Sequence, residues 1–397
     1  MRVSSLSIAQ NFVTQLGKQQ TALQRTQLQI STGERFSRPA QDPVAATRAL
    51  ELQRAVDETS QYATNAELAR NRLSLAEGAL TAVGETLQRL RELGIQAANA
   101  TETNESRALI ATEVRQRLDG LLQLANTQDG NGQYLFAGFS TRTRPFSQTP
   151  TGFQYNGDQG QRLLQIGPGR YIADGDPGSR VFQMARNGNG TFAVDTSPAN
   201  AGTAVVGARG LADPSQWDGG SYQLVFTAPD TYEVRDAANA VVTSGAYVPG
   251  QNVLFRGVQL EISGTPAVGD SFSVSPSSFQ DVFTTARELV DTLALSTEST
   301  TGRARFQNAI NHALEDIDQA LGNVLEVRAD IGGRLRSIED QQKTNVDLDV
   351  ELRTTLSQVK DLDYAEALTR LNQQLVGLQA AQQGYVKMQG LSLFNYL

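Results

Sequence analysis

The sequence of 397 residues contains no cysteine, which excludes disulfide bonds, thiol chemistry and zinc sites built on cysteine. This absence fits the cytosol, and it equally fits a protein that is exported unfolded and must not cross-link on the way. The single histidine, His312, leaves little material for a Ser-His-Asp triad and none for a site with several histidines. In the heptad frame of its helix His312 points away from the apolar face, which predicts a solvated side chain.

Long apolar runs are also missing. Nowhere do 18 apolar residues stand together, so no membrane-spanning helix is expected. The first residues, MRVSSLSIAQNFVTQLGKQQ, lack an uninterrupted apolar stretch and a small-residue cleavage site, so we expect no cleavable secretory signal. The formal net charge is -8 and there are no blocks of lysine and arginine, so nucleic acid is not an expected partner.

Motifs for catalysis are scarce. No stretch matches a phosphate-binding glycine loop. The Asp, Asn and Gly residues around Asp129 resemble a calcium loop, but the glycine is misplaced and the closing acidic residue is missing. The 42 acidic residues offer many accidental carboxylate pairs, and nothing favours one of them. We therefore expect a protein that is not an enzyme and has no cofactor and no metal site.

Proline is almost absent from both ends of the chain. Ten of the 12 prolines lie between Pro145 and Pro276, and the other two are Pro39 and Pro43. This distribution predicts helical flanks and a β-rich middle. Because the helical parts are the two ends, the β region is an insertion. The expected fold is α+β: a discontinuous bundle or coiled coil of long helices formed by both chain ends, with an inserted small β-rich domain.

The helical flanks carry apolar residues at alternating spacings of three and four, the mark of helices that pack lengthwise. An ordinary intramolecular bundle explains most of this stripe. The second helix, of 45–50 residues, carries Tyr62, Ala66, Ala69, Leu73, Ala76, Leu80, Val83, Leu87 and Leu90. The third carries Ile110, Val114, Leu118 and Leu121. After the β region follow Ile310, Leu314, Ile317, Leu321, Val324, Ile331, Leu335 and Ile338, interrupted by Arg328.

The middle of the chain alternates at period two, as half-buried strands do. The stretch FQYNGDQGQRLLQIGPGRYIADGD predicts short strands joined by glycine turns, with a hairpin. A mainly antiparallel domain is expected at 185–275, and Trp217 is interpreted as part of its core. Its inward-facing residues are Tyr222, Leu224, Phe226, Tyr232, Val234, Val258, Leu260, Ile262, Phe272 and Val274.

These patterns divide the chain into five segments. They are an N-terminal assembly helix with a connector (1–44), the first part of the bundle with a β-hairpin region (45–184), the inserted outer β domain (185–275), the second part of the bundle (276–345) and a C-terminal assembly helix (346–397).

The two terminal helices have a thin apolar seam and are otherwise rich in glutamine. The seam residues are Ala9, Phe12, Leu16, Leu23 and Ile30 in the first helix and Leu368, Leu371, Leu375, Leu378, Tyr385 and Met388 in the last. About a dozen apolar side chains contribute ~1.5–3 kcal/mol each when fully buried. Ordering the backbone costs on the order of 1–2 kcal/mol per residue. We therefore expect these ends to be disordered in the monomer and helical among neighbouring copies.

Four motifs in order along the chain carry a resemblance to a known family. They are QLQISTGERFSRPAQDPVAATRALELQ, GNGQYLFAGFSTRTRPF, GDSFSVSPSSFQDVF and KDLDYAEALTRLNQQLVGLQAAQQGYVKMQGLSLFNYL. Through them the chain resembles the bacterial flagellin superfamily and, within it, the hook–filament junction proteins.

The resemblance implies a structural, extracellular component of the bacterial flagellum, exported by the flagellar type III apparatus. It implies a ring of copies that joins hook to filament and templates filament assembly. The implied partners are the first hook-associated protein, flagellin and a flagellar export chaperone. The stretch TGERFSRPAQDP would be the connector between the first two helices, where Gly33 can end one helix and Asp42 can cap the next. The connector residues singled out are Gly33, Arg35, Pro39, Asp42 and Pro43.

Two other functions stay open at this point. A flagellin, as filament subunit, would share the architecture. A surface adhesin would use the outer β domain on a coiled-coil stalk.

Overall fold

The structure, a computed structural model, describes residues 5–390 and divides the chain into two compact units. Unit 1 comprises Met1–Thr64 and Gln341–Leu397, and unit 2 comprises Asn65–Asp340. Two long helices, α2 (Pro43–Ala97) and α6 (Thr300–Lys360), run through both units. At 55 residues, α2 is somewhat longer than the sequence predicted.

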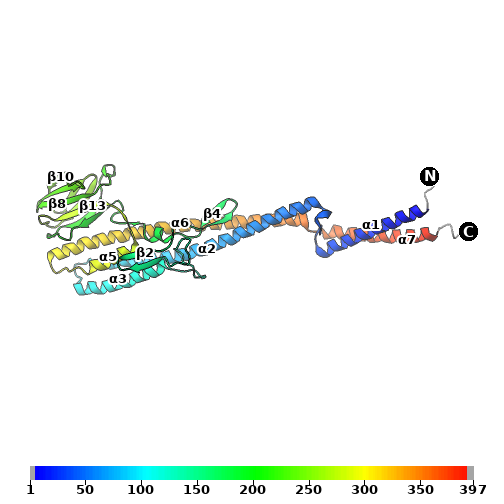
Figure 1. Ribbon diagram of the computed structural model, residues 1–397, viewed down its shortest axis with the longest axis horizontal. Coiled ribbons are helices and arrows are strands. Elements are labelled where there is room, and N and C mark those ends of the chain that lie inside the picture. Colours follow the sequence, from blue (N-terminus) through cyan, green and yellow to red (C-terminus); the bar gives the residue numbers. More distant parts are fainter. Residues whose placement is uncertain (1–4, 391–397) are drawn as a thin grey trace. The chain divides into compact units, whose positions relative to one another are not determined.

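In unit 1 the two ends of the chain form a helix pair. Helix α1 (Ser5–Thr32) lies antiparallel beside α7 (Tyr364–Gly390), as Figure 1 shows. Helix α6 continues through the predicted boundary at 345/346, and the break before the last helix falls at 361–363 instead. Predicted seam residues Ala9 and Met388 have side chains outside the described set.

In unit 2 the predicted stripe forms the core of a helical bundle. It packs α2 and α6 together with α3 (Asn104–Ala125) and α5 (Val282–Leu293), which begins at its N-cap Asp281. Every predicted stripe residue of α2 from Ala66 to Leu90 is buried. Of the predicted α6 stripe, Ile310, Ile317, Val324, Ile331 and Ile338 are buried, while Leu314, Leu321 and Leu335 pack against this core and are partly exposed. The predicted α+β fold with a discontinuous bundle is confirmed.

Arg328, which interrupts the stripe, has a partner on the facing helix. Its guanidinium donates two hydrogen bonds of 2.8 and 2.9 Å to Glu77 of α2, and the neighbouring Val327 occupies the seam. The interruption is therefore an ion pair at the edge of the α2–α6 contact, not a break in the helix.

Two hairpins lie against the bundle, where the sequence predicted one. Strand β1 (Phe146–Thr149) pairs with β2 (Gly152–Tyr155), and β3 (Leu163–Gly167) pairs with β4 (Arg170–Ala173). A short helix, α4 (Gly178–Phe182), follows. Phe146, Phe182 and other aromatic side chains of this region complete the bundle core.

Strands β6 to β13 form a sandwich of two antiparallel sheets, partly visible in Figure 1. The five-stranded sheet has the order β10-β9-β8-β13-β6 and the three-stranded sheet the order β11-β12-β7. All the predicted inward-facing residues belong to their shared core or pack against it, as does Trp217. The strands are β6 (Phe192–Thr196), β7 (Val205–Leu211), β8 (Tyr222–Ala228), β9 (Thr231–Asp236), β10 (Val241–Ala246), β11 (Asn252–Phe255), β12 (Val258–Ser263) and β13 (Ser271–Pro276). Where the chain leaves the bundle, the short strand β5 (Ala185–Arg186) pairs with β14 (Phe279–Gln280), where the chain re-enters the bundle.

The prediction of a solvated His312 was wrong. Its side chain is only 22% exposed and lies beside Asp316, with Nε2 3.2 Å from a carboxylate oxygen. The heptad frame correctly placed His312 off the bundle seam, but the sandwich covers that face of α6, and its strand β6 brings the carbonyl of Val194 within 3.3 Å of Nδ1. A partner inserted from more than a hundred residues away has no signal in local helical periodicity.

Candidate assembly surfaces

The terminal helix pair brings together most of the predicted seam residues. Phe12 of α1 stacks on Tyr385 of α7, with ring centroids 6.0 Å apart. The other seam residues that face the partner helix are half-buried: Leu16, Leu23 and Ile30 on α1, and Leu371 and Leu378 on α7.

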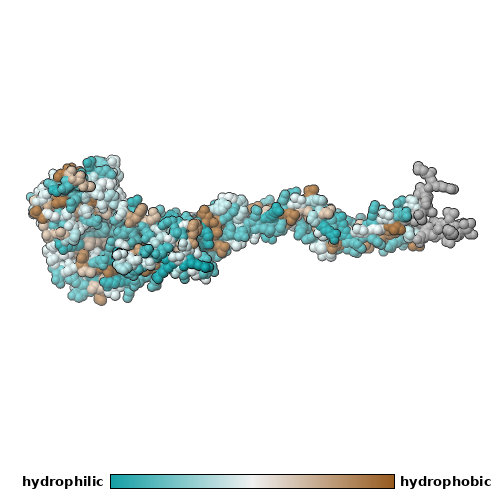
Figure 2. Space-filling view, viewed as in Figure 1, coloured by the Kyte–Doolittle hydropathy of each residue, from teal (hydrophilic) through white to brown (hydrophobic). Residues whose placement is uncertain are grey.

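Two predicted seam residues are more exposed than the others. Leu368 is 48% exposed and Leu375 is 37% exposed. Further apolar side chains stand open on the same two helices, among them Val13, Val376 and Val386. On the face seen in Figure 2, hydrophobic residues lie scattered between hydrophilic ones along this pair. The pair therefore leaves apolar surface on both helices that the other residues between 5 and 390 do not cover.

Sequence reasoning missed two glutamines in the pair. The side-chain oxygens of Gln19 on α1 and Gln374 on α7 are buried and have no hydrogen-bond donor among the described residues. Such an amide oxygen destabilises the contact, since burial without a partner costs about 1–3 kcal/mol. The glutamine-rich composition of both helices was the available signal.

The connector between α1 and α2 has the geometry that its residues predict. Gly33 has φ +73 and donates its N–H to the carbonyl of Gln29, which ends α1. Pro39 opens a short 3-10 turn, Pro39–Gln41. Asp42 then caps α2, because its carboxylate accepts the N–H of Ala45 at 3.0 Å and Pro43 occupies the first helical position. Arg35 forms an exposed ion pair of 3.4 Å with Asp42, which contributes little stability.

A second connector, between α6 and α7, is hydrogen-bonded to the first. The N–H of Arg35 donates to the carbonyl of Lys360 at 2.8 Å, and the N–H of Leu362 donates to the carbonyl of Gly33 at 2.9 Å. The ammonium of Lys360 also lies 3.0 Å from the carboxylate of Glu34. Asp363 caps α7 by accepting the N–H groups of Ala365 and Glu366. The two helix breaks therefore form one paired joint.

Phe36 anchors this joint, and the sequence analysis did not single it out. Its ring is buried in a small core with Ala45, Ala46 and Ala49 of α2 and with Leu356 and Val359 of α6. The small alanines leave room for an aromatic ring between the two helices. An aromatic residue in the middle of a polar connector was the sequence signal.

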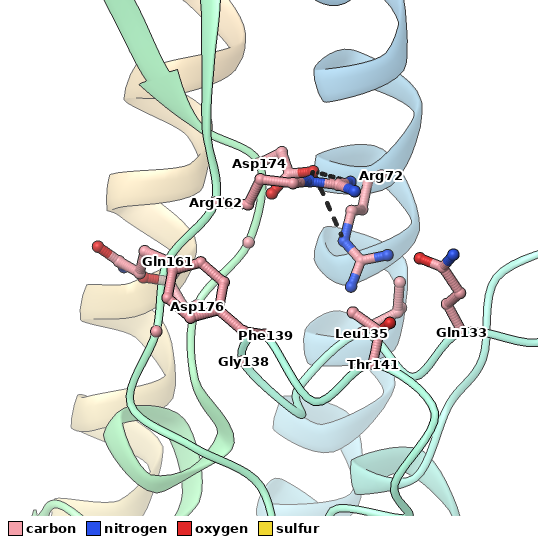
Figure 3. Close-up of a pocket in the computed structure, with 12 residues that line it drawn as sticks. Arg72, Gln133, Leu135, Gly138, Phe139, Thr141, Gln161, Arg162, Asp174 and Asp176 are labelled. Atoms are coloured by element: carbon pink, nitrogen blue, oxygen red, sulfur yellow. Dashed lines mark hydrogen bonds and ion pairs between the residues drawn. The ribbon is translucent and has the colours of Figure 1, made fainter.

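Unit 2 contains a charged cavity of about 150 Å³, shown in Figure 3. Arg72 of α2 enters it between the 133–141 loop and the β3–β4 segment, and its guanidinium lies 3.2 Å from Asp129 and 3.9 Å from Asp174. Asp174 also accepts a hydrogen bond of 2.7 Å from Arg162. Burial lowers the pKa of Arg72, and the charge of Asp174 opposes that shift.

Asp176, at the other side of this cavity, is bound even more tightly. It accepts two hydrogen bonds of 2.9 Å from Arg334 of α6, one of 2.8 Å from Arg180 and one of 2.8 Å from Gln161. The aspartates that line the described cavity are all paired with arginines, and no histidine lies beside the one hydroxyl, that of Thr141, to activate it. Because its arginines and aspartates already neutralise one another, the arrangement serves to hold loops on the bundle.

Between residues 5 and 390 no cluster of side chains has the composition of a metal site. Within that part of the chain, no helix combines the length and apolar character needed to cross a bilayer. The surfaces left to explain are those of the terminal pair and its joint.

Comparison with known proteins first defines the class. Residues 3–141 match the bacterial flagellin N-terminal helical region, and residues 314–397 match the bacterial flagellin C-terminal helical region. The chain thus carries at its two ends the two helical regions of bacterial flagellin, and the β sandwich lies between them.

Full-length similarity identifies the family within this class. Flagellar hook-associated protein 3 of Escherichia coli (strain K12) is 27% identical over 395 residues, which cover 100% of this chain and 99% of that relative. The crystal structure of FlgL of Xanthomonas campestris is 37% identical with a TM-score of 0.73, covering 77% of this chain and 99% of that one. The flagellar junction protein FlgL of Legionella pneumophila is 30% identical with a TM-score of 0.72, covering 78% and 100%.

The chain belongs to the family of flagellar hook-associated protein 3. It is a structural, non-enzymatic protein of the bacterial flagellum, with its place at the extracellular hook–filament junction.

Proposed function

We propose that copies of this chain form a ring at the junction and that their terminal helices assemble by coupled folding and binding. The observation that carries the proposal is the incomplete burial of the α1–α7 seam. Seam residues that would be enclosed in a finished coiled coil, such as Leu16 and Leu378, are half-buried, and Leu375 is exposed. Neighbouring copies would cover this surface.

Energetics favour such coupling. A two-helix pair of this length orders more than fifty residues, each at a cost of about 1–2 kcal/mol before hydrogen bonds are counted. A half-buried leucine returns only part of the ~1.5–3 kcal/mol of full burial. The pair is therefore marginal in one copy and gains stability when other copies bury Leu368, Leu375 and Val376. The predicted disorder of both ends in the isolated chain has the same reason: the cost of ordering these residues exceeds what half-buried side chains return.

The paired joint gives the terminal helices a defined path. The breaks at Gly33 and at 361–363 are hydrogen-bonded to each other. A change in the direction of α1 at its break would therefore be accompanied by the same change in α7. We propose that Arg35, Pro39 and the other predicted connector residues also touch adjacent copies in the ring.

The partners are proposed from this family membership. The first hook-associated protein would lie on the hook side and flagellin on the filament side. A cytoplasmic export chaperone would cover α7 before export, because an exposed apolar helix needs a partner wherever it is unassembled.

The proposal is tested by electron microscopy of cells from which the gene is deleted, with the medium assayed for flagellin. We expect bare hooks and shed flagellin, because export proceeds while the filament has no template. Persisting filaments, or flagellin missing from both cells and medium, would overturn the junction role. The second result would point to the filament subunit, whose purified form should also extend filaments from seeds.

A further inference from the structure

Helix α6 holds the β sandwich through polar side chains. The amide of Asn308 donates to the carbonyl of Ala204 at 2.9 Å and accepts the N–H of Val206 at 2.8 Å. Asn311 donates to the carbonyl of Val206 at 3.1 Å. Strand β7 is an edge strand of its sheet, so these amides occupy backbone groups that an edge leaves unpaired.

One turn further along α6, His312 forms the second part of this contact. Nδ1 lies 3.3 Å from the carbonyl oxygen of Val194 on β6, and Nε2 lies 3.2 Å from a carboxylate oxygen of Asp316. A carbonyl and a carboxylate can only accept hydrogen bonds, and a neutral imidazole has only one N–H to donate. Both contacts are therefore satisfied together only by the protonated imidazolium.

Asp316 connects His312 to the segment that precedes β6. Its other carboxylate oxygen accepts the N–H of Gly188 at 2.6 Å, and its side chain is 1% exposed. A buried carboxylate is stabilised by a positive partner, and loss of that partner leaves an uncompensated charge. The proton on His312 thus supports the Gly188 contact as well as the Val194 contact.

The charged groups around His312 come from every element packed against it. Asp195 of β6 lies 3.9 Å from Nδ1, Arg209 of β7 is paired with Glu315 of α6 at 2.5 Å, and Glu288 approaches from α5. Burial disfavours the charged ring, but Asp316 and then Asp195 outweigh burial and Arg209, and they raise the pKa of His312 to about 9.

A cleft of about 430 Å³ gives solvent access to His312. It is lined by Asp195 of β6, by Pro198 just after that strand, by Asp291 of α5 and by Arg305 and His312 of α6. Solvent can therefore exchange a proton with His312 while the sandwich stays folded.

We propose that His312 is a titratable latch: its imidazolium ties strand β6 to Asp316 of α6, and loss of its proton releases the β6 and β7 edges from the helix. The sandwich core is separate from the bundle core, so release does not require either to unfold.

The direction of the pH effect follows from the sign of the shift. The folded pKa lies above the ordinary value of 6.5, so the latch contributes fully below pH 6.5 and is lost as pH rises through about 9. A shift of that size corresponds to a weakening of the docked state on the order of 10²-fold upon deprotonation.

The full chain offers a direct test, because it has one histidine and therefore one imidazole signal in the NMR spectrum. The signal reports the pKa of His312. Hydrogen exchange of the Gly188 and Val206 amides, corrected for base catalysis, reports release, since both amides donate to α6 side chains. The amide of Phe226, which donates to the carbonyl of Asp270 inside the sandwich, reports its unfolding.

We expect protection of Gly188 and Val206 to fall together through the pKa of His312 while Phe226 stays protected. In His312→Gln both amides should exchange on the order of 10²-fold faster at pH 7, without a further transition. Asp316→Asn keeps an acceptor for Gly188 but removes the charge, so the pKa of His312 and the exchange transition should move down together.

Three results would overturn the latch. They are a pKa of His312 near its ordinary value in the unaltered chain, loss of protection at Gly188 alone, and equal loss at Phe226. An exchange transition in Asp316→Asn that does not follow the new pKa would also contradict it.

Discussion

Leucines at helical spacing have two different fates in this molecule. In the bundle of unit 2, Leu73, Leu80 and Leu87 are completely buried. In the terminal pair of unit 1, Leu23 and Leu371 are half-buried and Leu375 is 37% exposed. The period of the pattern is the same in both regions. What differs is the number of neighbours: in the bundle α2 packs among three other helices and two hairpins, whereas among the described residues α1 and α7 pack mainly on each other.

An apolar seam thus shows where a helix can bind another helix. It does not show how much of the seam is buried by the same chain. A pair of helices leaves most of each circumference open, so a stripe wide enough for a bundle is only partly used. The uncovered part is the candidate contact for further copies. Substitutions in the two regions should therefore separate folding from assembly.

The largest effect is expected for Leu375→Asp. A charge on the open side of α7 should abolish filament formation, because burying an unpaired carboxylate among neighbouring copies is strongly unfavourable. The thermal transition of the unit 2 bundle should stay nearly unchanged. Calorimetry of the purified chain and electron microscopy of cells measure the two quantities.

Leu109→Asp is the matched control for this change, because Leu109 is an exposed leucine on α3 of the bundle. It should alter neither quantity. If Leu375→Asp instead unfolds the isolated chain, or leaves filaments intact, the division between a closed bundle and an open terminal pair is wrong.

The next effect is expected for Leu87→Ala in the bundle. Removing a fully buried leucine should lower the free energy of unfolding by about 2–5 kcal/mol, because a cavity is left in a close-packed core. Leu378→Ala on α7 removes the same atoms from a half-buried site and should cost distinctly less in the isolated chain. Chemical denaturation compares the two variants, and equal losses would show that the terminal pair is as closed as the bundle.

The smallest effect is expected at the joint. Gly33→Ala places a Cβ on a residue whose φ is +73, and the hydroxyl of Tyr364 would lie 2.9 Å from that Cβ. The free energy that keeps the joint closed should therefore fall by roughly 1–2 kcal/mol. Hydrogen exchange of the Arg35 and Leu362 amides, which bond the two connectors, should report the loss.

Gly17→Ala provides the opposite control, since Gly17 lies inside α1 and, apart from the backbone of its own helix and its chain neighbours, no described atom lies within 4 Å of the added methyl group. Helix propensity predicts a gain of roughly 0.5–1 kcal/mol there. Unchanged exchange at the joint in Gly33→Ala, or a loss in Gly17→Ala of the same size, would refute the role of the left-handed glycine.

Much of the fold follows from local pattern. The three–four stripe located α2, α3 and α6, alternation located the inward face of the sandwich, and Gly33, Asp42 and Pro43 marked the first connector. The second connector was missed because 361–363 contains neither glycine nor proline. A signal was present, since Asp363 followed three residues later by Glu366 is a helix-start pattern, and Asp363 does cap α7.

The candidate sites divide in the same way. Phe12 and Tyr385 were predicted from helical spacing, and the structure stacks them. That Leu368 and Leu375 are left more exposed depends on how α7 is rotated against α1, and a broad apolar stripe does not fix this rotation.

The sequence by itself determined the long helices, the inserted β region and the ends of the first connector, because hydrophobic period, proline and capping side chains act within a few residues. Only the tertiary structure decided which side chains are covered. His312 became a largely buried ionic contact because strand β6 returns over α6. Phe36 became a core residue because the alanines of α2 and the apolar side chains of α6 close around it. Leu375 stayed 37% exposed because, among the described residues, α7 packs mainly on one helix, α1. Burial is set by partners distant in the chain, and no local pattern contains them.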